Sequence, residues 1–195
     1  MLKVIKAIEK GKKIRVLGFD DAPFNKERGS LVNISGILCS NTRFEGMLWS
    51  EVTKDGSDAT STLIDVIKTC KFYQQLHVIL LDGIAFGGFN IINLPLLSNT
   101  IELPCIAVMR KHPNLEAIDQ ALKNFDDYEN RAALIREAGK IHELDNFVFQ
   151  CANVEPSIAV KVLKSSTDTG NVPEALRLSH LIGAAIKTGE SGNRA

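Results

Sequence analysis

The segment Arg15-Val-Leu-Gly-Phe-Asp-Asp21 decides the fold, because it predicts a strand over residues 14–19 that ends in two aspartates. The run His77-Val-Ile-Leu-Leu81 predicts another strand, buried on both faces and followed by Asp82-Gly83. Between them, residues 31–40 and 44–53 predict two strands joined by a three-residue turn. The short connections make the first three strands an antiparallel meander.

Helices and strands alternate over the rest of the chain. A helix is predicted around residues 63–70, and a short one around residues 91–97. Strands are predicted at 104–108 and 147–150, with helices at 115–122, at 128–138 and after each of Pro156 and Pro173. Alternation of this kind implies parallel strands joined by right-handed crossovers. The predicted class is α/β with a ribonuclease H-like fold. By analogy with that fold, and not from the sequence pattern itself, the first strand is expected to lie beside the strand at 77–81 and parallel to it.

Length and composition fit one globular domain covering residues 1–195. Apolar residues make up 45% of the chain and charged residues 24%, which is ordinary globular usage. Lys plus Arg and Asp plus Glu both number 23, so any nucleic-acid site must be a local patch or rely on metal ions. The apolar runs are too short to span a membrane, and lysines interrupt the first residues too often for a signal peptide. We therefore expect a cytoplasmic protein with no membrane partner.

Two aspartates, Asp20 and Asp82, follow strands that the predicted fold places side by side. Neighbouring strands lie about 5 Å apart, so the two carboxylates are expected to meet at one edge of the sheet. A hard cation such as Mg²⁺ would relieve their repulsion, and Gly83 would let a substrate approach the backbone closely. Asp58 could add a third oxygen ligand, or could simply cap the helix that follows it. The alternative for Asp20 and Asp82 is a local role in turns.

Polar residues at two other places could complete such a site. Glu174, Arg177 and His180 recur every three residues on the last predicted helix, so they share one face. We expect His180 to point toward the aspartates and Arg177 to lie near the rim of the same cleft; the alternative is a solvated face. The pair Arg110-Lys111 follows a strand and could contact phosphate, or could be ordinary surface charge.

Four segments resemble an uncharacterised, mainly archaeal family catalogued as domain of unknown function 99, which is distantly related to endonuclease V. They are Arg15-Val-Leu-Gly-Phe-Asp-Asp-Ala-Pro-Phe24, Leu81-Asp-Gly-Ile-Ala-Phe-Gly-Gly-Phe-Asn-Ile-Ile92, Leu103-Pro-Cys-Ile-Ala-Val-Met-Arg-Lys111 and Pro173-Glu-Ala-Leu-Arg-Leu-Ser-His180. The resemblance implies a ribonuclease H-like fold and Mg²⁺-dependent cleavage of nucleic acid near deaminated adenine.

The same resemblance assigns individual residues. Asp20 and Asp82 match the two metal-binding aspartates of endonuclease V, and Arg110 falls where that nuclease has a basic residue. Arg177 matches the start of its last helix, and His180 stands where it has a further acidic residue. Its catalytic glutamate has no clear counterpart, Asp58 being nearest. The proline-tyrosine wedge that opens the duplex is also not evident.

Two hypotheses of different classes follow. The first is a Mg²⁺- or Mn²⁺-dependent endonuclease-like hydrolase that acts on DNA or RNA, with inosine-containing strands as the first substrates to test. Its catalytic residues would be Asp20, Asp82 and His180, its metal ligands Asp20, Asp82 and Asp58, and its nucleic-acid contacts Arg110, Lys111, Arg177 and Gly83. The second is a non-catalytic nucleic-acid or nucleotide binding module that kept the fold and lost the full carboxylate set.

Overall fold

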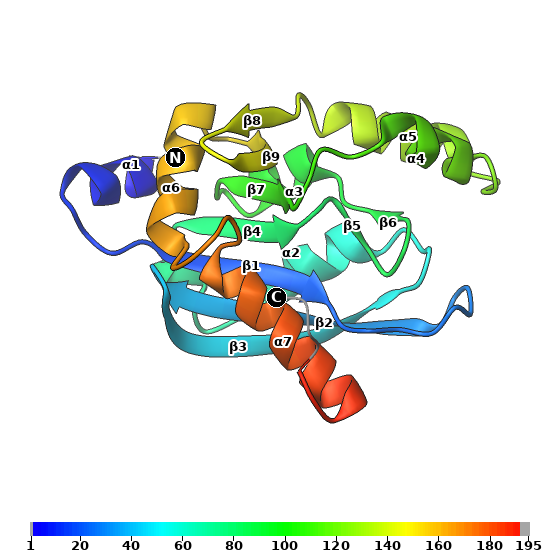
Figure 1. The fold of residues 1–195 in the computed structure, drawn as a ribbon, viewed down its shortest axis with the longest axis horizontal. Coiled ribbons are helices and arrows are strands. Elements are labelled where there is room, and N and C mark those ends of the chain that lie inside the picture. Colours follow the sequence, from blue (N-terminus) through cyan, green and yellow to red (C-terminus); the bar gives the residue numbers. More distant parts are fainter. Residues whose placement is uncertain (1, 192–195) are drawn as a thin grey trace.

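A central sheet organises the molecule, and the computed structural model describes it within residues 2–191. Its strand order is β3-β2-β1-β4-β7-β9-β8, and a separate small hairpin pairs β5 with β6 (Figure 1). The strands are β1 (Arg15–Asp21), β2 (Leu31–Ser40), β3 (Arg43–Thr53), β4 (Val78–Asp82), β5 (Ala85–Phe86), β6 (Asn90–Ile91), β7 (Cys105–Met109), β8 (His142–Leu144) and β9 (Phe147–Ala152).

The strand directions confirm the predicted fold class. β1 pairs antiparallel with β2, and β2 pairs antiparallel with β3, which is the predicted meander. β1 then pairs parallel with β4, and β4 with β7, as expected for buried apolar strands joined by helical crossovers. This is the ribonuclease H-like arrangement, and it places the ends of β1 and β4 next to each other.

The far edge of the sheet differs from the expectation of parallel strands. β9 runs antiparallel to β7 and forms a hairpin with β8, a strand that the sequence pattern did not predict. The turn of this hairpin is Asp145-Asn146, and both residues have positive φ, 51° and 69°. Aspartate and asparagine tolerate this conformation better than most residues, and two-residue hairpin turns require it. The chain therefore reverses before β9 instead of crossing over.

Helices cover both faces of the sheet. The helices are α1 (Leu2–Glu9), α2 (Ala59–Thr69), α3 (Leu94–Thr100), α4 (Leu115–Leu122), α5 (Tyr128–Glu137), α6 (Pro156–Ser166) and α7 (Glu174–Thr188), with a 3-10 turn η1 (Tyr73–Gln75). Residues of α2 and α3 belong to the core on one face, and residues of α1, α6 and α7 to the core on the other (Figure 1). No helix within residues 2–191 combines the length and apolar character needed to cross a bilayer.

The helix α7 lies directly on β1 and β2. A Cβ atom at Gly18 of β1 would come within 2.9 Å of the Ala175 Cβ and 3.0 Å of the Ala175 backbone carbon, closer than side chains can pack. One turn further, the buried Ser179 hydroxyl donates to the Ser35 carbonyl oxygen at 2.7 Å. The small residues thus bring the backbones of helix and sheet into close approach.

We expect the substitution Gly18→Ala to lower the free energy of unfolding by about 1–3 kcal/mol, because the new methyl group would push α7 away from β1. Gly46→Ala on β3 is the matched control: its methyl group would meet the tip of the Phe72 ring, a side chain that can move. Urea unfolding of both variants measures the difference. Equal losses would contradict the idea that the α7–β1 contact is the tight one.

Candidate functional site

Asp20 and Asp82 lie at the same edge and on the same face of the sheet. The parallel register pairs Phe19 with Leu81, which brings the residue after each of them side by side. Side chains alternate between faces along a strand, so Asp20 points the same way as Gly18, toward α7. Asp20 is 6% exposed, whereas Asp82 is partly exposed. The predicted adjacency of the two aspartates is confirmed.

His180 of α7 completes a small polar group with these aspartates. Its Nδ1 lies 3.0 Å from Asp20 Oδ2, across 160 residues of sequence. Arg110, just after β7, lies on the other side, where its Nη2 contacts Asp82 Oδ2 at 3.4 Å. The close packing of α7 on β1 brings His180 to Asp20, as the polar stripe on the last predicted helix led us to expect.

Burial and like charge strongly perturb Asp20. Burial raises the pKa of Asp20 to about 8, and the neighbouring carboxylates of Asp82 and Asp21 act in the same direction. Burial lowers the pKa of His180, and the positive charge of Arg110 adds to this. Burial therefore favours the protonated form of Asp20 and the uncharged form of His180.

Asp21 is a third carboxylate of this edge, which the sequence analysis did not assign to the site. It follows Asp20 directly, so its side chain points to the opposite face, where Oδ2 accepts a hydrogen bond of 2.6 Å from the Gly87 N–H. Burial raises the pKa of Asp21 to about 6, although the Gly87 hydrogen bond opposes the shift. The sequence did contain a signal for Asp21. Side chains of consecutive strand residues point to opposite faces of the sheet, so the Asp20-Asp21 pair places one carboxylate on each face.

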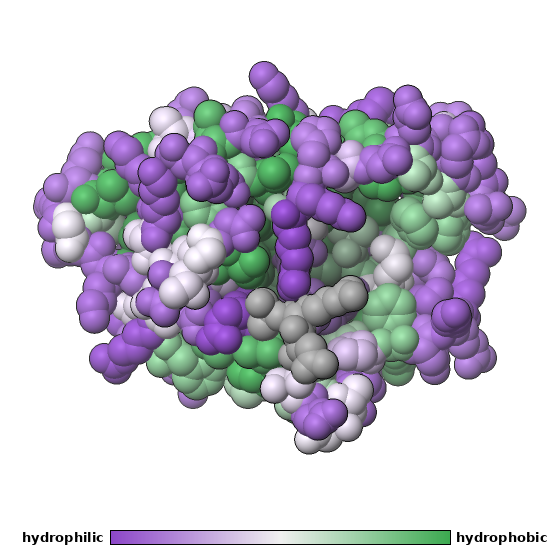
Figure 2. Space-filling model, in the orientation of Figure 1, coloured by the Kyte–Doolittle hydropathy of each residue, from purple (hydrophilic) through white to green (hydrophobic). Residues whose placement is uncertain are grey.

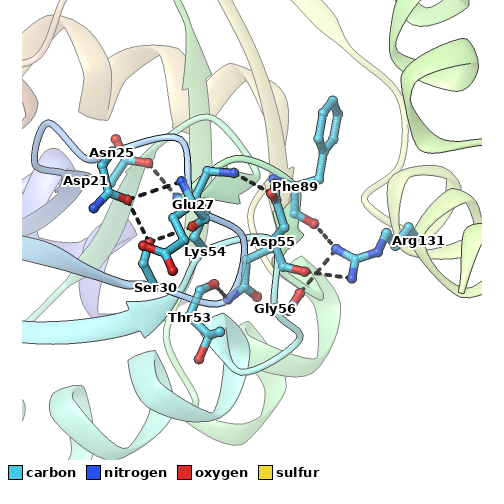
Figure 3. A network of polar contacts seen from close by, with 12 residues as sticks. Asp21, Asn25, Glu27, Ser30, Thr53, Lys54, Asp55, Gly56, Phe89 and Arg131 are labelled. Atoms are coloured by element: carbon cyan, nitrogen blue, oxygen red, sulfur yellow. Dashed lines mark hydrogen bonds and ion pairs between the residues drawn. The ribbon is translucent and has the colours of Figure 1, made fainter. Parts of the chain in front are cut away.

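A network of polar contacts fixes the loops around this edge (Figure 3). Asp55 accepts a hydrogen bond of 2.9 Å from the Phe89 N–H and pairs with Lys54 at 2.5 Å. The guanidinium of Arg131, on α5 and 5% exposed, donates to the carbonyl oxygens of Asp55, Gly56 and Phe89. A helix far along the chain thereby holds the loop after β3 and the β5–β6 hairpin together.

Asp58 belongs to this supporting network. Its carboxylate accepts hydrogen bonds from the Thr53 N–H at 3.1 Å, the Thr53 hydroxyl at 2.8 Å and the Asn90 side chain at 2.5 Å. Although burial opposes the shift, these donors lower the pKa of Asp58. Within residues 2–191, no hydrogen bond or ion pair joins Asp58 to Asp20 or Asp82. The contacts of Asp58 thus favour a structural role.

Within residues 2–191, no side-chain hydrogen bond or ion pair joins Arg177, Lys111 or Gly83 to Asp20, Asp82 or His180. Arg177 forms an ion pair with Glu174 one turn away on α7, with a shortest distance of 2.6 Å. Lys111 is exposed. Gly83 has φ of 81°, a conformation that favours glycine, and its N–H donates to the Val108 carbonyl oxygen. Among the predicted basic residues, Arg110 is therefore the one that contacts Asp82 directly.

A cavity of about 530 Å³ opens at Gly83, the residue that follows Asp82 in the chain. Figure 2 shows hydrophobic residues in the recess beneath α4 and α5. The volume of this cavity lies in the usual range for small-molecule sites. Apolar side chains form most of the wall: Ile84, Ala85, Phe89, Ile91, Met109, Pro113, Leu115, Ile118, Ile135 and Ile141.

Gln150 of β9 is a buried polar residue in the wall of this cavity, 3% exposed. Its Nε2 donates to the Gly139 carbonyl oxygen at 2.7 Å, which fixes the orientation of the amide. The Oε1 atom remains as a hydrogen-bond acceptor. Neither the cavity nor Gln150 was predicted, because they depend on how α4 and α5 fold back over the sheet.

The sequence profile of the endonuclease dU family matches residues 12–187. The chain belongs to this family. A UPF0215 protein of Archaeoglobus fulgidus is 38% identical over 184 residues, covering 94% of this chain and 99% of that protein. A UPF0215 protein of Pyrococcus horikoshii is 40% identical over 185 residues, covering 92% and 95%. The resemblance to an archaeal family is confirmed.

Solved structures agree with this membership. The crystal structure of a protein of unknown function from Archaeoglobus fulgidus superposes with a TM-score of 0.84 at 37% identity, covering 89% of this chain and 98% of that one. Endonuclease V from Ciona intestinalis, in complex with DNA containing inosine, gives a TM-score of 0.53 at 17% identity, with coverages of 87% and 84%. Endonuclease V from Bacillus subtilis gives 0.59 at 11%, with coverages of 90% and 81%. At these identities the nuclease structures show the shared fold.

The perturbed pKa of Asp20 predicts that Asp20→Asn stabilises the protein at high pH when divalent cations are absent. The native protein keeps a proton on Asp20 that the unfolded chain releases above pH 4, so this contribution to stability is lost as the pH rises toward 8. Asparagine does not ionise. The advantage of the asparagine variant should therefore grow from near zero around pH 4 to about 4–6 kcal/mol at pH 9, at about 1.4 kcal/mol per pKa unit.

Urea unfolding at a series of pH values, with a chelator present, measures this advantage. Asp65→Asn, at an exposed aspartate of α2, is the matched control and should leave the pH profile unchanged. If the free energies of unfolding of Asp20→Asn and wild type differed by the same amount at all pH values, the raised pKa of Asp20 would be contradicted.

Proposed function

We propose that the chain is a divalent-cation-dependent phosphodiesterase that cleaves nucleic acid beside a deaminated base. The observation that carries the proposal is the meeting of Asp20, Asp82 and His180 at one sheet edge, in a member of the endonuclease dU family. The family description points to deoxyuridine, and the Ciona intestinalis complex contains inosine. Uracil and hypoxanthine are both products of base deamination.

The residues at this edge fit a hard cation such as Mg²⁺ or Mn²⁺. Asp20 and Asp82 offer carboxylate oxygens, and their mutual repulsion in a partly buried position is what a cation would relieve. Within residues 2–191 no three His, Cys, Asp or Glu side chains gather as a metal-binding group. Mg²⁺ commonly uses one or two carboxylates and fills its remaining positions with water and substrate phosphate. A cation held there supplies positive charge to phosphoryl oxygens and acidifies water.

The other side chains of the edge have roles that follow from their contacts. The Nδ1 of His180 lies 3.0 Å from Asp20 Oδ2, and burial lowers the pKa of His180, so its imidazole can accept or donate a proton beside the reacting phosphate. Arg110 is partly exposed and pairs loosely with Asp82, so its guanidinium can turn to a phosphate. The proposal keeps three further positions as contacts to the phosphate backbone of the nucleic acid: Lys111, Arg177 and Gly83.

The cavity at Gly83 is the proposed binding site for the deaminated base. Its apolar walls suit a flat ring, and Phe89 is an aromatic surface on which a base can stack. The Gln150 Oε1 can accept a hydrogen bond from a ring N–H. Uracil and hypoxanthine carry such a ring N–H where cytosine and adenine carry an unprotonated nitrogen, so the amide would favour the deaminated bases.

Metal titration tests the first part of the proposal. We expect Asp20→Asn and Asp82→Asn each to weaken Mn²⁺ binding at least tenfold, a loss of about 1.4 kcal/mol or more, because each removes a charged ligand. Cleavage of uracil- or inosine-containing single strands should fall about 100-fold or more. For wild type, Mn²⁺ affinity should rise about tenfold per pH unit from pH 6 to 8 and then level off, because the cation displaces the Asp20 proton.

Asp65→Asn serves again as the control and should behave as wild type. Metal binding that survives both site substitutions would refute the proposed site. Aspartate-dependent metal binding without cleavage of any strand would instead favour a non-catalytic nucleic-acid or nucleotide binding module. The Arg110–Asp82 ion pair is the observation that supports this second candidate, since it partly neutralises a carboxylate without a metal.

The substitution Gln150→Leu tests the proposed base recognition. It keeps the apolar packing and removes the acceptor, so we expect the preference for uracil over cytosine to fall about tenfold. Competition assays with strands that differ at one base measure this preference. Gln120→Leu, at an exposed position of α4, should leave the preference unchanged. Undiminished discrimination in Gln150→Leu would exclude Gln150 as the recognition residue.

A further inference from the structure

A stripe of lysines covers the exposed side of α1, at the end of the sheet opposite the Asp20–Asp82 edge. Lys3, Lys6 and Lys10 recur at helical spacing and share one face, and Lys12 and Lys13 follow directly; all five are exposed. We call these five residues the lysine stripe. Figure 2 shows mostly hydrophilic side chains over the end of the molecule that carries α1.

The positive charge of the lysine stripe is not neutralised by the protein itself. Within residues 2–191 none of the five lysines forms an ion pair. Residues 2–15 contain six basic side chains and one acidic side chain, Glu9, although the whole chain has zero net charge. The helix α6 adds the exposed Lys161 on the same face of the sheet. Like charges at this spacing destabilise a helix unless an anion lies against them.

The buried side of α1 argues against a lipid surface as that anion. Val4 is 0% exposed and Ala7 is 5% exposed, and both pack into the core on this face of the sheet. A helix that binds membranes needs a free apolar side to enter the lipid. α1 has already used its apolar side, so the stripe offers charge alone. Regularly spaced phosphates match such a surface.

We propose that the lysine stripe is a second nucleic-acid contact, which binds the phosphates of a strand whose target nucleotide lies at the Asp20–Asp82 edge. This inference rests on the proposed function. The strand β1 begins just after the lysine stripe and ends at the Asp20–Asp82 edge. The five steps from Arg15 to Asp20 span about 17 Å at roughly 3.3 Å per residue. At about 3.4 Å per nucleotide along a strand, the stripe contacts phosphates at least about five nucleotides from the target.

Binding of fluorescent single-stranded DNA tests the inference. The variant Lys3→Gln/Lys6→Gln/Lys10→Gln should bind a 30-nucleotide strand at least tenfold more weakly than wild type in low salt. The slope of log affinity against log salt concentration should fall by about 2, because three phosphate contacts are lost. A strand of only four nucleotides, centred on the target base, should bind both proteins equally. Lys68→Gln/Lys71→Gln/Lys187→Gln, at exposed lysines elsewhere, should match wild type.

The outcomes separate this inference from the proposed function. Normal Mn²⁺ binding and cleavage, with an unchanged salt slope for the 30-nucleotide strand, would overturn the lysine-stripe contact alone. Equal weakening on both strand lengths would also overturn it, because the loss would then lie at the catalytic edge. Loss of binding to vesicles of anionic lipid, with unchanged binding to DNA, would reassign the stripe to membranes. If the lysine variant showed the reduced salt slope but wild type cleaved no strand, the lysine-stripe contact would stand and the proposed nuclease activity would be refuted.

Discussion

The site depends on the absence of a side chain at Gly18. Because glycine stands there, α7 can rest on the backbone of β1, and the next turns of the helix then fall opposite the end of the strand. The Ser179 hydroxyl donates to the Ser35 carbonyl oxygen, and the His180 Nδ1 contacts Asp20 Oδ2. A helix held further from the sheet would leave Asp20 without its partner.

The same edge concentrates groups that oppose folding. Asp20, Asp21 and Asp82 are near one another, and two of them are buried enough that their carboxyl groups resist ionisation. A protein selected for stability alone would place apolar residues here. The surrounding loops compensate, since Arg131 donates to three backbone carbonyl oxygens (Figure 3). Asp58 also accepts hydrogen bonds from Thr53 and Asn90. An unfavourable arrangement supported by rigid surroundings is typical of a functional site.

The sequence predicted those parts of the structure that depend on periodicity along one segment. The meander followed from apolar runs and short turns, whereas the parallel β1–β4 pair, and with it the meeting of Asp20 and Asp82, was predicted by analogy with the ribonuclease H-like fold. The direction of β9 did not, because the Asp145-Asn146 turn decides it and two residues carry little pattern. On sequence alone Asp58 could be a metal ligand or a helix cap, and its hydrogen bonds to Thr53 and Asn90 are visible only in the structure. The cavity beside Gln150 likewise forms only from segments brought together in three dimensions. α1 was not predicted, because its eight residues carry only about two turns of the alternation between buried Val4 and Ala7 and the exposed lysines.

The contact between His180 and Asp20 joins residues 160 positions apart, and this has a consequence for how the molecule acquires its chemistry. Contacts between such distant residues carry a large loop-closure cost and form after local structure. The sheet can pair β1 with β2 and β2 with β3 while α7 is still undocked. Docking of α7 would then be the step that turns a folded sheet into a competent site. Local detachment of this one helix would separate His180 from Asp20.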